Sequence, residues 1–108
     1  MPKRKEIILA RVFFSDSPES KVRPAIVLSD DTYHSTGFIL VSAITTASDG
    51  YCAPISEKDA NCQLDKNSGA RFDGIIKLHE KQAIRSIGRV SAGFHNGLVE
   101  KIVGTIAK

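Results

Sequence analysis

Apolar residues gather in short runs separated by polar segments, and this alternation predicts a chain built mainly of β-strands. Glu6–Phe14 is rich in Ile, Leu, Val and Phe and is long enough for a strand covered on both faces. The other predicted strands are Pro24–Ser29, Phe38–Thr45, Tyr51–Ser56, Gly74–Leu78 and Ala83–Val90. Pro54 cannot donate a ladder hydrogen bond, so Tyr51–Ser56 is assigned to an edge of the sheet.

Turn-forming residues mark the connections between these strands. Ser15–Ser20 collects Ser, Asp and Pro, Asp30-Asp31 ends the second strand, and Ser48-Asp49-Gly50 is a turn signal. The polar segment Glu57–Gly69 is predicted to be mostly loop.

The C-terminal segment has the periodicity of an amphipathic helix. Ser91 is a suitable N-cap, and the helix is expected to run through Ala107. Its apolar stripe consists of Phe94, Leu98, Val99, Ile102, Val103 and Ile106. Five to seven short strands with one terminal helix predict a mainly β fold, a small and partly open barrel of the SH3-like or OB kind. The 108 residues have the length of one domain, spanning 1–108.

Composition narrows the setting without naming a function. With 42% apolar and 25% charged residues the chain has an ordinary globular balance, and its apolar runs are too short to cross a bilayer. No apolar signal segment follows the basic Met1–Lys5, so a cytoplasmic location is expected and no membrane association. The net charge of +3 is compatible with a polyanionic partner. Cys52 and Cys62 lack metal-ligand spacing and are expected to be free thiols, with no metal and no cofactor.

Two short segments carry the candidate chemistry. In Lys21-Val22-Arg23-Pro24 the proline favours an extended Arg23, so a planar, permanently charged donor projects from the start of a strand. Such a donor suits a phosphate, although a surface arginine beside a strand-opening proline explains the same residues. Thr45 and Thr46 end the third strand, where their hydroxyls can donate to phosphate oxygens, but threonine is also common in strands for its propensity alone.

Taken in order along the chain, these segments resemble the MazF/PemK family of bacterial toxins. The similarity lies in Glu6–Leu9, in Val22–Ser29 (VRPAIVLS), in Ala43–Thr46 (AITT), in Asp49–Tyr51, in Asp73–Ile76 and in the helical tail. The resemblance implies a CcdB/MazF-type SH3-like barrel, a homodimer, and a toxin that cuts single-stranded RNA without a metal. It also implies attack by the substrate's own 2′-hydroxyl, which gives a cyclic phosphate, and a cognate antitoxin that blocks the site.

The resemblance assigns roles to individual residues. Arg23 stabilises charge on the reacting phosphate or protonates the leaving oxygen, and Thr45 bonds the scissile phosphate. Lys77 and His79 stand where some members place an acid and a base, and His79 has a pKa range suited to a general base. An exposed Lys and His on a half-buried strand account for them equally well. The remaining substrate-binding candidates are Glu19, Lys21, Pro24 and Thr46.

The chain departs from the family pattern in several places, which leaves other functions open. Lys5 stands where members usually have a glycine, and Ser17–Ser20 aligns only roughly with the Gly-Ser-Glu-Gln of the family loop. His34, in a polar loop, and His95, on the helix, are expected to be solvated. The alternatives are a non-catalytic toxin of the same fold that binds DNA gyrase, and a degenerate member that only binds RNA or antitoxin. The sequence specifies neither the RNA motif nor the antitoxin.

Overall fold

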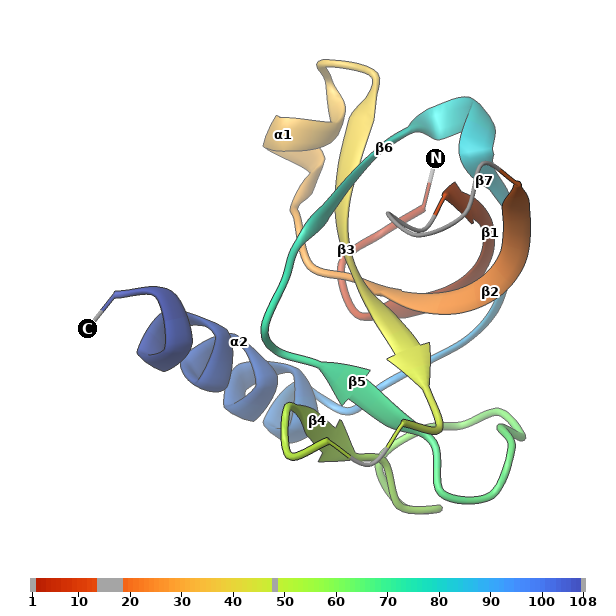
Figure 1. Ribbon diagram of the computed structural model, residues 1–108. Coiled ribbons are helices and arrows are strands. Elements are labelled where there is room, and N and C mark those ends of the chain that lie inside the picture. The colour runs from red at the N-terminus through yellow and green to blue at the C-terminus, as the bar shows by residue number, and fades with distance from the viewer. Residues whose placement is uncertain (1, 14–18, 48, 108) are drawn as a thin grey trace.

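The chain folds into one strongly curved antiparallel sheet with a helix against its lower edge (Figure 1). The computed structural model describes residues 2–13, 19–47 and 49–107. The strands are β1 (Glu6–Phe13), β2 (Ser20–Val27), β3 (Phe38–Thr45), β4 (Cys52–Pro54), β5 (Gly69–Arg71), β6 (Ile76–His79) and β7 (Ala83–Arg89). The helices are α1 (Asp31–His34), the 3-10 turn η1 (Glu80–Gln82) and α2 (Ala92–Ile106). This is the mainly β fold with a C-terminal helix that the sequence predicts.

The sheet follows the order β4-β5-β3-β2-β1-β7, and β6 also pairs with β3. The long strand β3 therefore has three partners: β6 at its start, β2 at its middle and β5 at its end. Each of these strands pairs with only part of β3, so the sheet divides along β3 where one partner ends and the next begins. That division positions the site described below.

Both faces of β1 are buried, as its composition predicts. Ile7 and Ile8 point to opposite faces, and each is 0% exposed. On one face lies a helix-side cluster made of Ile7, Ile26, Ile44, Ala53, Ala70, Val90, Leu98 and Ile102. On the other lies a barrel cluster made of Ile8, Ala10, Val12, Ala25, Val27, Ile39, Val41 and Leu78. Ala53 of β4 and Ala70 of β5 thus share an apolar cluster with Leu98 and Ile102 of α2.

Several predicted boundaries are confirmed and others are wrong. The strand Phe38–Thr45 has the predicted bounds, β4 is an edge strand, and the Ser91 hydroxyl accepts a hydrogen bond from the Phe94 amide at 3.2 Å as the N-cap of α2. β2 begins at Ser20 rather than Pro24, because its pairing with β1 continues to Phe13. Most of the predicted loop Ser15–Ser20 lies outside the described residues.

Two short elements were not predicted at all. The three-residue strand β5 lies at the end of the polar segment that was assigned to loop. The helix α1 is a single turn, capped by the Asp30 side chain, which accepts a hydrogen bond from the Tyr33 amide at 3.1 Å. Neither element is long enough to show a hydrophobic period.

The prediction that His34 and His95 are solvated is wrong. Their exposed fractions are 4% and 5%. His34 Nε2 lies 2.7 Å from the hydroxyl of Ser29, which fixes the ring beside β3. His95 belongs to the buried side of α2, and its Nε2 has no hydrogen-bond partner among the described residues.

This burial of His95 predicts a loss of stability in mild acid. Desolvation of the ring, followed by the charges of Arg4 and Lys5, lowers the pKa of His95 below its ordinary value of 6.5. A histidine whose pKa is lowered in the folded state favours unfolding once it is protonated. The free energy of unfolding is therefore expected to fall as the pH drops below about 6.5 toward the folded-state pKa.

Urea unfolding at a series of pH values checks this expectation. His95→Gln, which cannot be protonated in this range, should show a smaller decline between pH 7 and pH 5 than the wild type. An equal decline in both proteins would mean that another group causes the acid sensitivity.

Candidate active site

Arg23 and Thr45 come together where β2 and β3 separate. The two strands pair from Ala25↔Ala43 to Val27↔Val41. Two residues further along the same register, Arg23 would lie opposite Thr45, but the ladder has already ended there. On the other side of β3 from β2, Thr45 pairs with Gly69 of β5. Pro24, which has no N–H to donate, lies just outside the β2–β3 ladder.

A hollow of about 770 Å³ opens at this division of the sheet. It is lined by Leu9, Arg23, Pro24, Ala43, Ile44, Thr45, Thr46, Gln63, Leu64, Asp65, Ser68, Arg71 and Ile87. Four of the sequence-predicted residues are among them: Arg23, Pro24, Thr45 and Thr46. Apolar side chains from four segments lie beside charged and hydroxyl groups, a mixture typical of sites that bind small polar molecules or nucleotides.

The two arginines of the hollow differ in how their charge is balanced. Arg71 Nη2 lies 2.8 Å from Asp49 Oδ2 and 2.7 Å from Asp73 Oδ2. Hydrogen bonds from Arg71 lower the pKa of both carboxyls, and the pKa of Arg71 is raised in turn. Arg23, in contrast, is exposed, and its side chain makes no ion pair or hydrogen bond with another described residue. Its guanidinium is therefore available to an anion in the hollow.

Thr45 is half-buried, and its hydroxyl oxygen accepts a hydrogen bond from the Ala47 amide at 3.2 Å. That bond uses the oxygen as an acceptor, so the hydroxyl proton can still be donated. Thr46, the next residue, is exposed. A guanidinium and a hydroxyl from two adjoining strands can thus both donate to one phosphate group.

The structure does not bring the other predicted residues into this hollow. Lys21 is exposed on β2, two residues before Arg23, and Glu19 is exposed just ahead of that strand. Most of the loop that precedes Glu19 is outside the described residues.

Lys77 and His79 lie at the opposite end of β3. Lys77 pairs with Leu40 and His79 with Phe38. Thr45 is five residues beyond Leu40, roughly 16 Å along an extended strand. The Lys77 ammonium lies 4.4 Å from the centre of the Phe38 ring, and the His79 ring meets the same ring edge-on at 5.2 Å.

His79 also has a local structural role as the N-cap of η1. Its Nδ1 accepts a hydrogen bond from the Lys81 amide at 3.1 Å, while the Gln82 side chain accepts one from the His79 amide at 2.8 Å. This reciprocal pair is a capping box. The catalytic roles of Lys77 and His79 stay predictions that the placement of these residues does not support.

Sequence reasoning missed the residues that form the far wall of the hollow. Gln63, Asp65, Ser68 and Arg71 come from the polar segment and the short strand β5. Their only sequence signal is the high density of polar side chains between Glu57 and Arg71, which is equally typical of a solvated loop.

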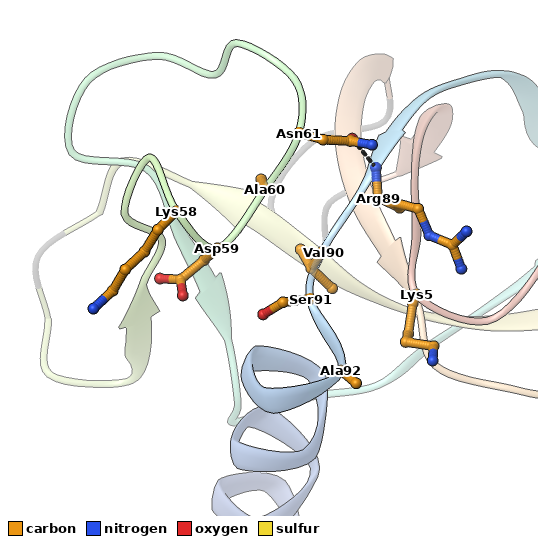
Figure 2. Close-up of a pocket in the computed structure, with 9 residues that line it drawn as sticks. All are labelled: Lys5, Lys58, Asp59, Ala60, Asn61, Arg89, Val90, Ser91 and Ala92. Atoms are coloured by element: carbon orange, nitrogen blue, oxygen red, sulfur yellow. Dashed lines mark hydrogen bonds between the residues drawn. The ribbon is translucent and has the colours of Figure 1, made fainter.

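A second, shallower hollow of about 360 Å³ lies at the start of α2 (Figure 2). Lys5, Lys58 and Arg89 line it, but Figure 2 shows the Lys58 side chain pointing away from the other two. It contains neither Arg23 nor Thr45. We therefore take the larger hollow as the candidate active site.

The structure addresses the expectation about the two cysteines directly. Cys52 and Cys62 are free thiols, as expected, and burial raises the pKa of both. Among the described residues no helix has the length and apolar character needed to cross a membrane. No group of three or more His, Cys, Asp or Glu side chains within 2–13, 19–47 and 49–107 is arranged to hold a metal ion.

Comparison with solved structures shows the same fold in several bacterial toxins. The Mycobacterium tuberculosis toxin MazF-mt6 superposes with a TM-score of 0.74 at 22% identity, covering 94% of this chain and 96% of that one. MazE-MazF (Form-III) from Deinococcus radiodurans gives a TM-score of 0.78 at 15% identity, covering 98% and 96%. An endoribonuclease in complex with its cognate antitoxin, from Mycobacterial species, gives 0.76 at 13%, covering 98% and 93%. These identities are low, so the likeness is one of fold.

Comparison of the sequence with curated proteins gives no match. The sequence model of the PemK-like, MazF-like toxins, in contrast, matches residues 3–103, nearly the whole chain. That match includes Arg23, Thr45 and every strand of the sheet that divides between them. The chain therefore belongs to the family of PemK-like, MazF-like toxins of type II toxin–antitoxin systems.

Proposed function

We propose that this toxin is an endoribonuclease that cuts single-stranded RNA in the hollow between β2 and β3. The observation that carries the proposal is the guanidinium of Arg23, which has no carboxylate partner among the described residues, beside the hydroxyl of Thr45. Both line a hollow with apolar as well as polar walls. Unpaired RNA offers the matching groups, a charged phosphate and the apolar face of a base.

The proposed reaction uses a nucleophile that the substrate carries. The ribose 2′-oxygen forms a bond to phosphorus while the bond from phosphorus to the 5′-oxygen breaks. The 2′-hydroxyl proton passes to solvent, and the 5′-oxygen takes up a proton as it leaves. The products are a 2′,3′-cyclic phosphate and a 5′-hydroxyl end, and the reaction needs no metal-bound water.

Arg23 and Thr45 have separate parts in this reaction. A guanidinium stays protonated in proteins, so Arg23 is assigned to stabilise the negative charge that grows on the phosphate oxygens, and not to transfer its proton. Thr45 donates a hydrogen bond to a second oxygen of the same phosphate. Both donors act through fixed position, because the backbone of each is paired in the sheet, Arg23 with Ala10 and Thr45 with Gly69.

Lys77 and His79 are not needed for this mechanism. We expect His79→Ala to retain cleavage within about threefold and to keep the pH profile of the wild type, while losing on the order of 1 kcal/mol of stability with the η1 cap. Cleavage rates from pH 5 to pH 9, together with urea unfolding, measure the two effects. A flattened acid limb in the mutant would return the role of general base to His79.

The partners are proposed from the family and from solved structures of the same fold. We propose a cognate antitoxin as the regulator of this chain, because solved neighbours include a MazE-MazF structure and an endoribonuclease with its antitoxin. A homodimer and a cytoplasmic location complete the proposal.

Incubation with single-stranded RNA in the presence of a chelator tests the function. Cleavage that leaves cyclic phosphate and 5′-hydroxyl ends would support the nuclease. No cleavage by the purified wild-type protein would contradict it and favour a toxin that acts by binding.

A further inference from the structure

The segment Asn61–Asp65 forms one wall of the candidate active site. Exposed and partly buried side chains alternate along it as in a β-strand, although it is not part of a strand. Cys62 and Leu64 are partly buried against the helix-side cluster. Gln63 and Asp65 are exposed, and both line the hollow that contains Arg23. Two polar side chains are thereby held toward the place where the substrate would lie.

This segment is fixed to β7 at its first residue. The Asn61 amide donates to the Arg89 carbonyl at 3.1 Å, and the Arg89 amide donates to Asn61 Oδ1 at 2.7 Å (Figure 2). Beside it, a Cβ added to Gly88 would lie only 2.6 Å from the Cys62 Cβ. Only glycine allows the segment to approach the strand this closely.

The other end of the segment is fixed just as firmly. The Asp65 carbonyl accepts hydrogen bonds from the Ser68 amide at 3.1 Å and from the Ser68 hydroxyl at 2.6 Å. Ser68 is buried, and its own carbonyl accepts from the Ile55 amide at 3.0 Å. The wall is therefore preorganised before any substrate arrives.

The side chains of Gln63 and Asp65 are left without hydrogen bonds to any described residue. A carboxylate repels the phosphates that Arg23 attracts, so the useful partner for Asp65 is a hydrogen-bond donor that carries no negative charge. Bases supply such donors as exocyclic amino groups: N4 of cytosine, N6 of adenine and N2 of guanine. Uracil has no amino group, and its one donor on that edge, the ring N3–H, lies between two carbonyl oxygens that repel a carboxylate.

On the basis of the proposed function, we infer that Asp65 and Gln63 read the Watson–Crick edge of the unpaired base next to the scissile phosphate. Asp65 accepts a hydrogen bond from the amino group of that base, and the Gln63 amide bonds a neighbouring atom of the same edge. The subsite accepts adenine, cytosine or guanine and disfavours uracil.

Sequencing of the ends produced from a randomised RNA pool tests this inference. The wild type should cut with one adjoining position depleted of uracil. In Asp65→Asn, whose amide can donate as well as accept, the discrimination against uracil at that position should fall about tenfold. Gln63→Ala should broaden the same position.

Glu57→Gln is the matched control, because Glu57 is an exposed carboxylate that precedes this segment but does not line the hollow. It should leave the cleavage profile unchanged. An unchanged profile in Asp65→Asn would overturn base reading while the nuclease stands. Loss of cleavage at every sequence in Asp65→Asn would also overturn it, because the carboxylate would then serve the reaction itself.

Binding of oligonucleotides that cannot be cleaved tests base reading separately from the nuclease activity. Fluorescence anisotropy would compare 2′-O-methyl RNAs that differ only in cytosine or uracil at one position. If the wild type cuts nothing yet binds the cytosine oligonucleotide about tenfold more tightly, with the difference lost in Asp65→Asn, the base-reading wall is supported and the nuclease is contradicted. Equal binding of both oligonucleotides would overturn base reading.

Discussion

Replacing Arg23 with alanine is expected to lower the rate of RNA cleavage by at least about 100-fold, the typical effect of removing one fixed donor to developing charge. Arg23 has no ion pair with another described residue, whereas the charge of Arg71 is balanced by Asp49 and Asp73. Its loss would therefore leave the hollow without a free cation from the described part of the chain. The side chain is exposed, so the folded structure should be little affected.

Single-turnover cleavage of a defined RNA measures this effect, with thermal unfolding as the check on folding. Arg85→Ala is the control, because Arg85 is an exposed strand arginine that lies outside the hollow. It should cut at the wild-type rate. Arg23→Lys should recover only part of the activity, since an ammonium cannot match two phosphate oxygens in the plane of a guanidinium. Full activity in Arg23→Ala would exclude the proposed role and point to a contaminating nuclease.

The central strands β1 and β3 could be predicted because side chains on both of their faces are buried. Residues of β1 and β3 belong to both apolar clusters, so apolar runs mark these strands in the sequence. The start of β2 could not be predicted in the same way. Ser20–Arg23 is polar or exposed and belongs to the strand only through its pairing with β1, a contact between distant segments.

The sequence predicted some residues of the candidate site and missed others, for a physical reason. Arg23 and Thr45 belong to strand ends whose register can be followed from the apolar runs beside them. The family resemblance assigns Lys77 and His79 to the same chemistry. However, β6 pairs with the start of β3, and that register places both residues at the opposite end of β3 from Thr45. Gln63 and Asp65 enter the hollow only because Gly88 lets their segment lie against β7.

Ile26→Ala is expected to lower the free energy of unfolding by about 2–5 kcal/mol. Ile26 is 0% exposed and lies in the helix-side cluster, where β1, β2 and α2 meet. Its truncation removes apolar contacts and leaves a cavity that the surrounding strands cannot easily close. A domain of this size has only about 5–15 kcal/mol of stability in total, so the mutant should unfold at markedly lower urea concentration.

Two matched substitutions separate this effect from a general one. Ile26→Val should cost about 0.5–1.5 kcal/mol. Ile84→Ala removes an isoleucine that is 50% exposed and should change stability little. If Ile26→Ala lost no more stability than Ile84→Ala, the helix-side cluster would not be the core of the fold. Ile26→Ala should still cut RNA at a temperature where it stays folded, because its side chain does not line the hollow. The two substitutions with the largest expected effects therefore change different properties. Arg23→Ala loses activity and keeps stability, whereas Ile26→Ala loses stability and keeps activity.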